Sequence, residues 1–281
     1  MSLRKRLFFI VPTAALSLLT YVSLASGQNP YYPLPEGTCP PTQNTIVGTA
    51  GNDLRSGTPL NDLMFAGAGD DVFEGESGDD CLIVGTGNDR ANGGTGQDRS
   101  FGEDGDDVLG GNDGDDNISG QADNDGLSGG DDNDRLSGGL GNDRVSGGDG
   151  RDRASGGTGD DTLSMGGAVD RGEGGPGADK VFGGPQEDLL SGGSGDDRVR
   201  GDSGNDRVRG RSGADAVIGG GGNDTVSGGS GPDRLAGGDG RDRLLSRDGT
   251  RDQVTCGGSR DIAVIDSADS ISRDCEIVRV G

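Results

Sequence analysis

The chain contains no histidine, only 3% aromatic residues and only 28% hydrophobic residues. Without histidine there is no imidazole base and no imidazole metal ligand, which removes the commonest acid–base chemistry near neutral pH. The low apolar content offers little burial to offset the entropy of ordering a backbone with 61 glycines. The sequence therefore argues against an enzyme and predicts that the chain does not fold unaided.

Long hydrophobic runs are also scarce, and the only one is at the N-terminus. Residues 7–24 are largely apolar, follow the basic residues 4–6 and precede the small residues Ala25, Ser26 and Gly27. This order predicts a secretory signal peptide over residues 1–27. An uncleaved membrane anchor is the alternative, which Pro12 and the small-residue exit disfavour. Cleavage would leave a secreted protein, extracellular or at the cell surface and outside the membrane, with its formal charge changed from −24 to −27.

Residues 28–47 begin with five prolines and two tyrosines, which predicts an extended linker that leads into an N-terminal cap. It offers no room for a catalytic domain.

The four cysteines form an even set and should pair in an exported protein. Three pairings are possible, and we favour Cys39 with Cys81 and Cys256 with Cys275. The second bridge would close a loop of about 20 residues, worth roughly 3 kcal/mol. It would staple a small C-terminal cap, residues 246–281, whose short strand-like runs at 262–265 and 276–280 could cover an exposed edge.

Aspartate recurs every nine residues from Asp53 to Asp242, twenty-two consecutive times. The surrounding units, over residues 48–245, follow the pattern G-G-x-G-x-D-x-U-x, where U is apolar; residues 138–146 are a clean example. This pattern is typical of the calcium-binding parallel β-helix nonapeptide.

Each position of the nonapeptide has a chemical reason. Glycine at the first, second and fourth positions permits a tight or left-handed backbone whose carbonyls point at a cation. Such a turn and one aspartate supply about half of the oxygen shell that Ca²⁺ needs. A turn one coil further on must supply the rest, so Asp143 would share an ion layer with Asp161, two repeats away.

The last three residues, x-U-x, predict a very short strand whose middle side chain points inward. With two nonapeptides per coil, twenty-two units predict about eleven coils around a core one aliphatic side chain thick. The inward positions are expected at Leu136, Val145, Leu163, Val181, Val199, Val208, Val217, Val226, Leu235 and Leu244.

On these repeats the chain resembles the repeats-in-toxin, or haemolysin-type calcium-binding, family, over about seventy per cent of its length. The resemblance implies an all-β fold, a right-handed parallel β-roll (a β-solenoid), disordered without calcium and folded with it. Residues 45–53 and 256–261 also look like secreted actinobacterial members of the group. Relatives often carry such a roll as the tail of an enzyme, whereas here the roll is nearly the whole mature chain.

The expected cofactor is Ca²⁺, bound as multiple ions. The expected ligands are the sixth-position aspartates Asp71, Asp80, Asp89, Asp98, Asp107, Asp116, Asp134, Asp143, Asp152, Asp161, Asp179, Asp188, Asp197, Asp206, Asp215, Asp224, Asp233 and Asp242. They are joined by the turn glycines Gly139, Gly141, Gly148, Gly150, Gly157, Gly159, Gly220, Gly222, Gly229 and Gly231.

Several units depart from the pattern. Residues 165–173 keep Asp170 but place Gly172 where an aliphatic residue belongs, which predicts a kink or a weak site. Arg211 would bring a bulky cation to a second position, so we rank Asp206 and Asp215 below Asp224, Asp233 and Asp242. The array is expected to end at Ser246, where the nine-residue register breaks.

Basic residues recur at the outward-facing seventh position, and this ladder could dock a polyanion such as a cell-surface polymer. We favour a simpler interpretation, in which each pairs with nearby carboxylates, because the residues divide between both faces of the roll. The ladder consists of Arg90, Arg99, Arg135, Arg144, Arg153, Arg171, Lys180, Arg198, Arg207, Arg234 and Arg243. Nucleic acid is not an expected partner.

Two functional classes follow. The first is a secreted calcium-binding protein whose ion uptake is its activity. The alternative is a calcium-stabilised structural or adhesive rod at the cell surface. An ice-binding solenoid would want outward ladders of threonine, and the outward positions carry arginine and serine instead.

Overall fold

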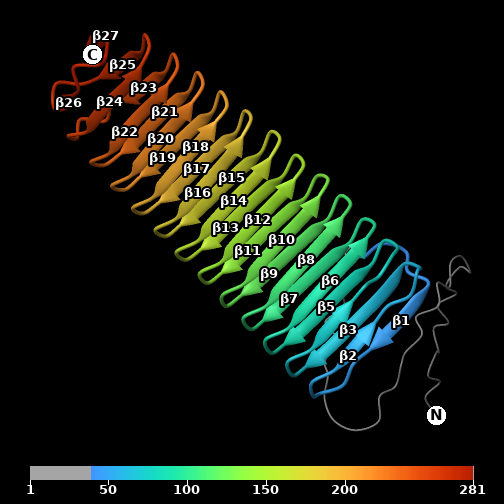
Figure 1. The fold of residues 1–281 in the computed structure, drawn as a ribbon. Helices are drawn as coiled ribbons and strands as arrows, with labels where there is room; N and C mark the ends of the chain where they lie inside the picture. Colours follow the sequence, from blue (N-terminus) through green and yellow to red (C-terminus); the bar gives the residue numbers. More distant parts are fainter. Residues whose placement is uncertain (1–38, 281) are drawn as a thin grey trace, which may run out of the picture. The chain divides into compact units, whose positions relative to one another are not determined.

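The computed structural model describes residues 39–280. The expected signal peptide and most of the proline-rich linker lie outside the described residues. Residues 39–280 contain twenty-seven β-strands arranged in two parallel sheets, and no helix in this part could cross a membrane (Figure 1). The protein is a right-handed parallel β-solenoid, as the sequence predicts.

The two sheets face each other and consist of alternating strands along the chain. The fourteen-stranded sheet contains, in spatial order, β1 (Asn44–Val47), β3 (Asp62–Ala68), β5 (Cys81–Thr86), β7 (Arg99–Asp104), β9 (Asn117–Ala122), β11 (Arg135–Leu140), β13 (Arg153–Thr158), β15 (Arg171–Pro176), β17 (Leu189–Ser194), β19 (Arg207–Ser212), β21 (Thr225–Ser230), β23 (Arg243–Ser246), β25 (Ile262–Ile265) and β27 (Ile277–Val280). The thirteen-stranded sheet contains β2 (Leu54–Ser56), β4 (Val72–Glu74), β6 (Arg90–Thr95), β8 (Val108–Asp113), β10 (Gly126–Asp131), β12 (Arg144–Asp149), β14 (Thr162–Gly167), β16 (Lys180–Pro185), β18 (Arg198–Ser203), β20 (Ala216–Gly221), β22 (Arg234–Asp239), β24 (Gln253–Gly258) and β26 (Ser270–Ile271).

Each coil contains two nonapeptides, as expected. In the pairing of β11 with β13, Leu136 lies beside Ala154, eighteen residues further on. The stack has about thirteen turns, more than the eleven predicted. The difference arises because β1 precedes the repeats and pairs with β3, while β24 to β27 continue both sheets beyond residue 245.

The expectation that the array ends at Ser246 was wrong. One interval is stretched to ten residues, from Asp242 to Asp252, and the nine-residue period then resumes at Asp261. The backbone N–H groups of Asp233 and Asp242 still donate to the carboxylates of Asp252 and Asp261, now nineteen residues away. The extra residue therefore lengthens one turn without ending the stack.

The strands are longer than the three residues expected. A typical strand, β12, has six residues and covers positions seven to nine of one repeat and one to three of the next. Only the fourth to sixth positions form the turn. The eighth and first positions are buried, so an aliphatic side chain and the first glycine of the next repeat both face inward.

The core is the column of eighth-position side chains. The ten aliphatic residues named above are all at most 4% exposed, which confirms the inward positions. At the departure around Asp170, Met165 at a first position is fully buried and fills the space that Gly172 leaves at an eighth position. A Cβ at Gly172 would lie 3.0 Å from the Met165 sulfur. The large residue thus lies at the first position and the small one at the eighth, and together they fill the core. The strand pairing therefore continues through β15 in the same register, and the expected kink does not occur.

Both predicted disulfides are present. Cys39 pairs with Cys81 and Cys256 pairs with Cys275, with Cα–Cα distances of 5.6 and 5.1 Å. Cys81 occupies an outward-facing seventh position and is nevertheless fully buried. One bridge thus lies near each end of the solenoid.

Candidate metal centre

The sixth-position aspartates form two ladders along the solenoid, one in each row of turns. Each is at most 3% exposed from Asp71 to Asp242. The backbone N–H of one aspartate donates to Oδ1 of the aspartate one coil further on, as from Asp143 to Asp161. These bonds are 2.7–2.9 Å long throughout this span. The structure therefore brings together the pairs that the period predicts.

The second carboxylate oxygen of these residues is different. Oδ2 is buried and has no hydrogen-bond partner in every ladder aspartate from Asp71 to Asp242, and again in Asp261. An ionised carboxylate that is buried with an unpaired oxygen is strongly unfavourable unless a cation or a proton neutralises it. A buried carboxylate oxygen that needs a positive charge therefore recurs in every coil from Asp71 to Asp242.

Where the first position of a repeat is glycine, Oδ2 of the ladder aspartate lies against that glycine, and at most of these positions a carbonyl oxygen from the next coil lies there too. A Cβ at Gly138 would lie 2.2 Å from Oδ2 of Asp143 and 2.4 Å from the carbonyl oxygen of Gly156. Gly138 has no left-handed backbone, so it is glycine because two oxygens approach its Cα. The close approach explains this position better than the left-handed backbone that we expected there.

The second and fourth glycines are left-handed, as predicted. The ten glycines expected to contribute to the ion sites have φ between 115° and 135°. A Cβ at Gly141 would in addition lie 1.9 Å from the carbonyl oxygen of Asp123 in the preceding coil. These residues close the three-residue turn that holds each aspartate.

Burial raises the pKa of the ladder carboxyls from Asp71 to Asp242 above their ordinary value of 3.8. Desolvation is the first cause, and neighbouring carboxylates in the ladder raise the pKa further, while the N–H bond to Oδ1 opposes both. The pKa reaches about 7 for Asp116, Asp161 and Asp197. It reaches about 6 for Asp206 and Asp224. The metal-free roll therefore holds protons near neutral pH.

These residues fit calcium. Ca²⁺ takes six to eight oxygen ligands in flexible geometry, and unpaired carboxylate oxygens beside backbone carbonyls are such ligands. No group of three or more carboxylate, cysteine or histidine side chains that could hold a metal gathers within residues 39–280. Carbonyl oxygens must therefore complete each shell. A bound ion would supply the positive charge that these buried carboxylates lack.

Sequence reasoning missed three residues of the ladder. Asp125, Asp170 and Asp261 have the same burial, the same bond to Oδ1 and the same unpaired Oδ2 as the expected ligands. The nine-residue period already contained Asp125 and Asp170. The ten-residue interval before Asp252 concealed Asp261.

Arg211 does not intrude on the ladder. Its guanidinium turns outward, where Nε donates to Ser191 Oγ and Nη2 lies 3.4 Å from Glu173 Oε1. Asp206 and Asp215 have the same buried geometry as Asp224. Their lower rank as ligands stays a prediction.

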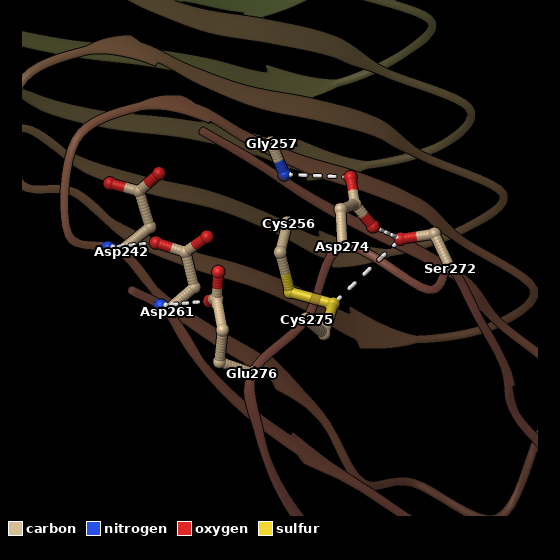
Figure 2. The surroundings of a disulfide bond; sticks show 8 residues. All are labelled: Asp242, Cys256, Gly257, Asp261, Ser272, Asp274, Cys275 and Glu276. Carbon is tan, nitrogen blue, oxygen red and sulfur yellow. Dashed lines mark hydrogen bonds between the residues drawn. A yellow bond between two sulfur atoms is a disulfide. The ribbon is translucent and has the colours of Figure 1, made fainter. Parts of the chain in front are cut away.

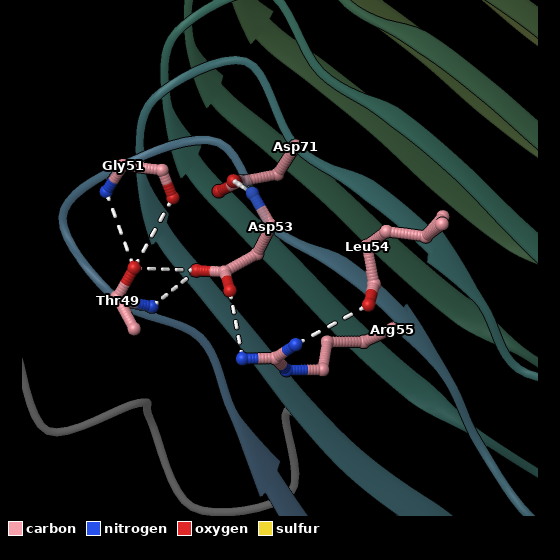
Figure 3. Close-up of polar contacts among 6 residues, drawn as sticks. All are labelled: Thr49, Gly51, Asp53, Leu54, Arg55 and Asp71. Atoms are coloured by element: carbon pink, nitrogen blue, oxygen red, sulfur yellow. Dashed lines mark hydrogen bonds and ion pairs between the residues drawn. The ribbon is translucent and has the colours of Figure 1, made fainter.

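The N-terminal end of the ladder is satisfied without a metal. Figure 3 shows that Oδ2 of Asp53 accepts from the N–H and Oγ1 of Thr49, at 2.5 and 2.7 Å. Oδ1 of Asp53 lies 2.7 Å from Nη2 of Arg55. The hydrogen bonds from Thr49 hold the pKa of Asp53 below its ordinary value. In the next turn, Thr58 bonds Oδ2 of Asp62 in the same way.

The C-terminal end is closed by a different residue. Figure 2 shows that the N–H of Asp261 donates to Oε2 of Glu276 at 2.9 Å, where an aspartate would stand in a further coil. Close by, the N–H of Gly257 donates to Oδ2 of Asp274 at 3.0 Å, beside the Cys256–Cys275 bridge. In the other row of turns, the N–H of Asp252 donates to Oδ1 of Asp269 at 3.0 Å. Each of the two ladders thus begins and ends on side chains that replace the missing coil.

The repeats that carry this geometry match a known protein family. The family model described as the RTX calcium-binding nonapeptide repeat matches residues 56–91, 92–127, 128–163, 166–199, 173–208, 191–226 and 218–250. None of the curated proteins compared with the chain matches it. Among solved structures, it is similar to a hyperactive, Ca²⁺-dependent, β-helical antifreeze protein from an Antarctic bacterium. That structure is 17% identical, with 85% of this chain and 83% of that chain covered and a TM-score of 0.35.

The matched residues span most of the chain, so the protein belongs to the RTX calcium-binding nonapeptide-repeat family. It binds multiple calcium ions through its stacked coils.

Proposed function

We propose that this is a secreted calcium-binding protein in which ion uptake and folding are one event. One observation supports the proposal above others: twenty-one buried aspartates each retain an unpaired Oδ2 in the folded chain. Folding without a cation at a pH above the raised pKa values would leave these charges uncompensated. An ion that binds only the folded chain contributes its binding free energy to folding.

Export completes the proposal. Residues 1–27 are the signal peptide, residues 28–47 the linker and N-terminal cap, and residues 48–245 the nonapeptide repeats of the calcium-binding roll. The segment after residue 245 adds the last coils and closes the roll. Low calcium inside the cell would keep the acidic chain expanded, and high calcium outside would fold it. The activity is ion binding, without catalysis.

A calcium-stabilised rod is the second candidate. One ladder is closed by Thr49 and Arg55 at its start and by Asp269 at its end. The other is closed by Thr58 at its start and by Glu276 at its end. Closed ends favour a solenoid of fixed length over one that polymerises end to end. This second function would require a surface partner.

The test is chelation of the mature protein, residues 28–281 with both disulfides formed, at pH 8. We expect excess chelator to abolish the β-sheet circular dichroism signal and calcium to restore it. Magnesium at the same concentration should not, because it demands a smaller, rigid octahedral shell. A roll that keeps its β signal in chelator would refute calcium-dependent folding.

A further inference from the structure

Three arginines occupy the seventh position of the larger sheet in consecutive coils. Arg135 on β11 pairs in register with Arg153 on β13, and Arg153 pairs with Arg171 on β15. The three strands are neighbours in the stack (Figure 1), so the residues are spaced by about 4.8 Å. All three side chains are exposed. No strand pairing of the described chain contains a longer in-register run of basic residues.

The seventh-position ladder divides between the two sheets, as expected. The expected pairing with nearby carboxylates, however, is sparse. Among the described residues, Arg207 pairs with Glu187 at 3.1 Å, whereas Arg135, Arg153 and Arg171 take part in none of the ion pairs found in residues 39–280. In-register like charges repel one another. The three consecutive arginines therefore repel one another, and no ion pair within residues 39–280 offsets this repulsion.

The surroundings of this run hold little counter-charge. At the fifth position, the turns that lead into β11, β13 and β15 carry Asn133, Arg151 and Val169, none of which is acidic. At the fourth position of the same turns, Asp132 is the one acidic residue. Asp115, in the turn one coil before Arg135, has its pKa lowered by hydrogen bonds from Asn133 and also by Arg135. Those hydrogen bonds, from the N–H and Nδ2 of Asn133, already occupy Asp115 Oδ1.

The neighbouring ninth-position column adds hydroxyl donors. Ser137 and Ser155 pair in register beside Arg135 and Arg153. The next residue in that column, Glu173, forms an ion pair with Arg211. The acidic residues of the adjoining turns, such as Asp131 and Asp149, end strands β10 and β12 of the other sheet. The arginines and serines of β11 and β13, together with Arg171, thus form a cationic strip, with acidic residues such as Asp131 and Asp149 in the adjoining turns.

We propose that this strip, Arg135, Arg151, Arg153 and Arg171 with Ser137 and Ser155, binds a linear polymer of closely spaced phosphate groups. A guanidinium forks onto two oxygens of a phosphate, and a phosphate has further oxygens that can accept from a serine hydroxyl. The strip exists only when the coils are stacked, so binding rests on the calcium-loaded fold. Folding in calcium would then create a polymer-binding surface.

The test measures binding of inorganic polyphosphate to the mature protein, with free calcium buffered above saturation. The variant R135S/R153S/R171S removes the consecutive run. The matched control R90S/R144S/R234S removes three seventh-position arginines from β6, β12 and β22 of the other sheet, where no two are adjacent. Both variants change the net charge equally. Circular dichroism and ion counting establish that each variant is folded and loaded.

We expect the wild type to bind with an affinity that falls as salt rises. The triple variant on the larger sheet should lose about tenfold or more in affinity, and the control should stay within about twofold. Equal losses in both variants would overturn the strip and leave only non-specific attraction. No binding by the folded wild type would overturn it outright. Equal Arg135-dependent binding of polyglutamate or DNA would overturn the assignment to a phosphate polymer.

Discussion

The calcium-free mature protein should gain β-structure as the pH is lowered from 8 to 5, with a midpoint between about 6 and 7. Burial raises the pKa of the ladder carboxyls to about 7 at Asp134 and Asp188 and to about 6 at Asp242, from an ordinary value of 3.8. Folding of the metal-free chain therefore takes up protons. Its stability is greatest below pH 4 and falls as the pH rises through the folded-state values. Protons would thus replace calcium as the neutralising charge.

Far-ultraviolet circular dichroism and small-angle scattering in chelator, followed across this pH range, measure the effect. In saturating calcium the same scan should be flat down to about pH 6, because the ions already neutralise the ladder. A metal-free chain that stays unstructured at pH 5, or stays folded at pH 8, would contradict the account of the buried carboxylates.

Removing the charge from three ladder carboxyls should weaken calcium binding far more than removing it from their immediate neighbours. In D107N/D161N/D197N the amide can keep the Oδ1 acceptor while one calcium ligand is lost at each of three sites. We expect fewer bound ions and a rise of about tenfold or more in the calcium concentration at the folding midpoint. Even second-shell partners of a metal are worth 10–100-fold in affinity.

The chain supplies a matched control at the fifth position. Asp106, Asp160 and Asp196 are exposed and precede the same three ladder residues. Each Oδ1 accepts a backbone N–H eighteen residues further on, which asparagine can also accept. D106N/D160N/D196N changes the net charge equally and should move the midpoint by no more than about twofold. Equal shifts in the two variants would mean that net charge, and not the ladder, controls folding.

Much of the architecture was predictable because a single period determines it. Eighteen residues per coil, the inward column from Leu136 to Leu244 and the stacking of Asp143 on Asp161 all follow from the nonapeptide. Both disulfides are the pairing that the sequence favours among three possible ones, because Cys256 and Cys275 flank the expected C-terminal cap.

Other features depend on contacts between coils that the repeat does not show. Met165 is larger than the usual first-position glycine, and Gly172 is smaller than the usual eighth-position aliphatic residue. The two side-chain positions meet in the core from strands of different sheets, so in the sequence each looks like a separate departure from the repeat. The closing roles of Thr49 and Glu276 arise only where a coil is missing. The stack is also longer than predicted, because the backbone ladder tolerates one inserted residue before Asp252.

Calcium titration of the mature protein at pH 8, with bound ions counted while circular dichroism is recorded, tests the central claim most directly. The account predicts a cooperative transition from random coil to β-structure in which many ions bind. Their number should be on the order of one for each coil of the solenoid in each row of turns. A flat titration, with the chain folded or disordered throughout and few ions bound, would contradict it.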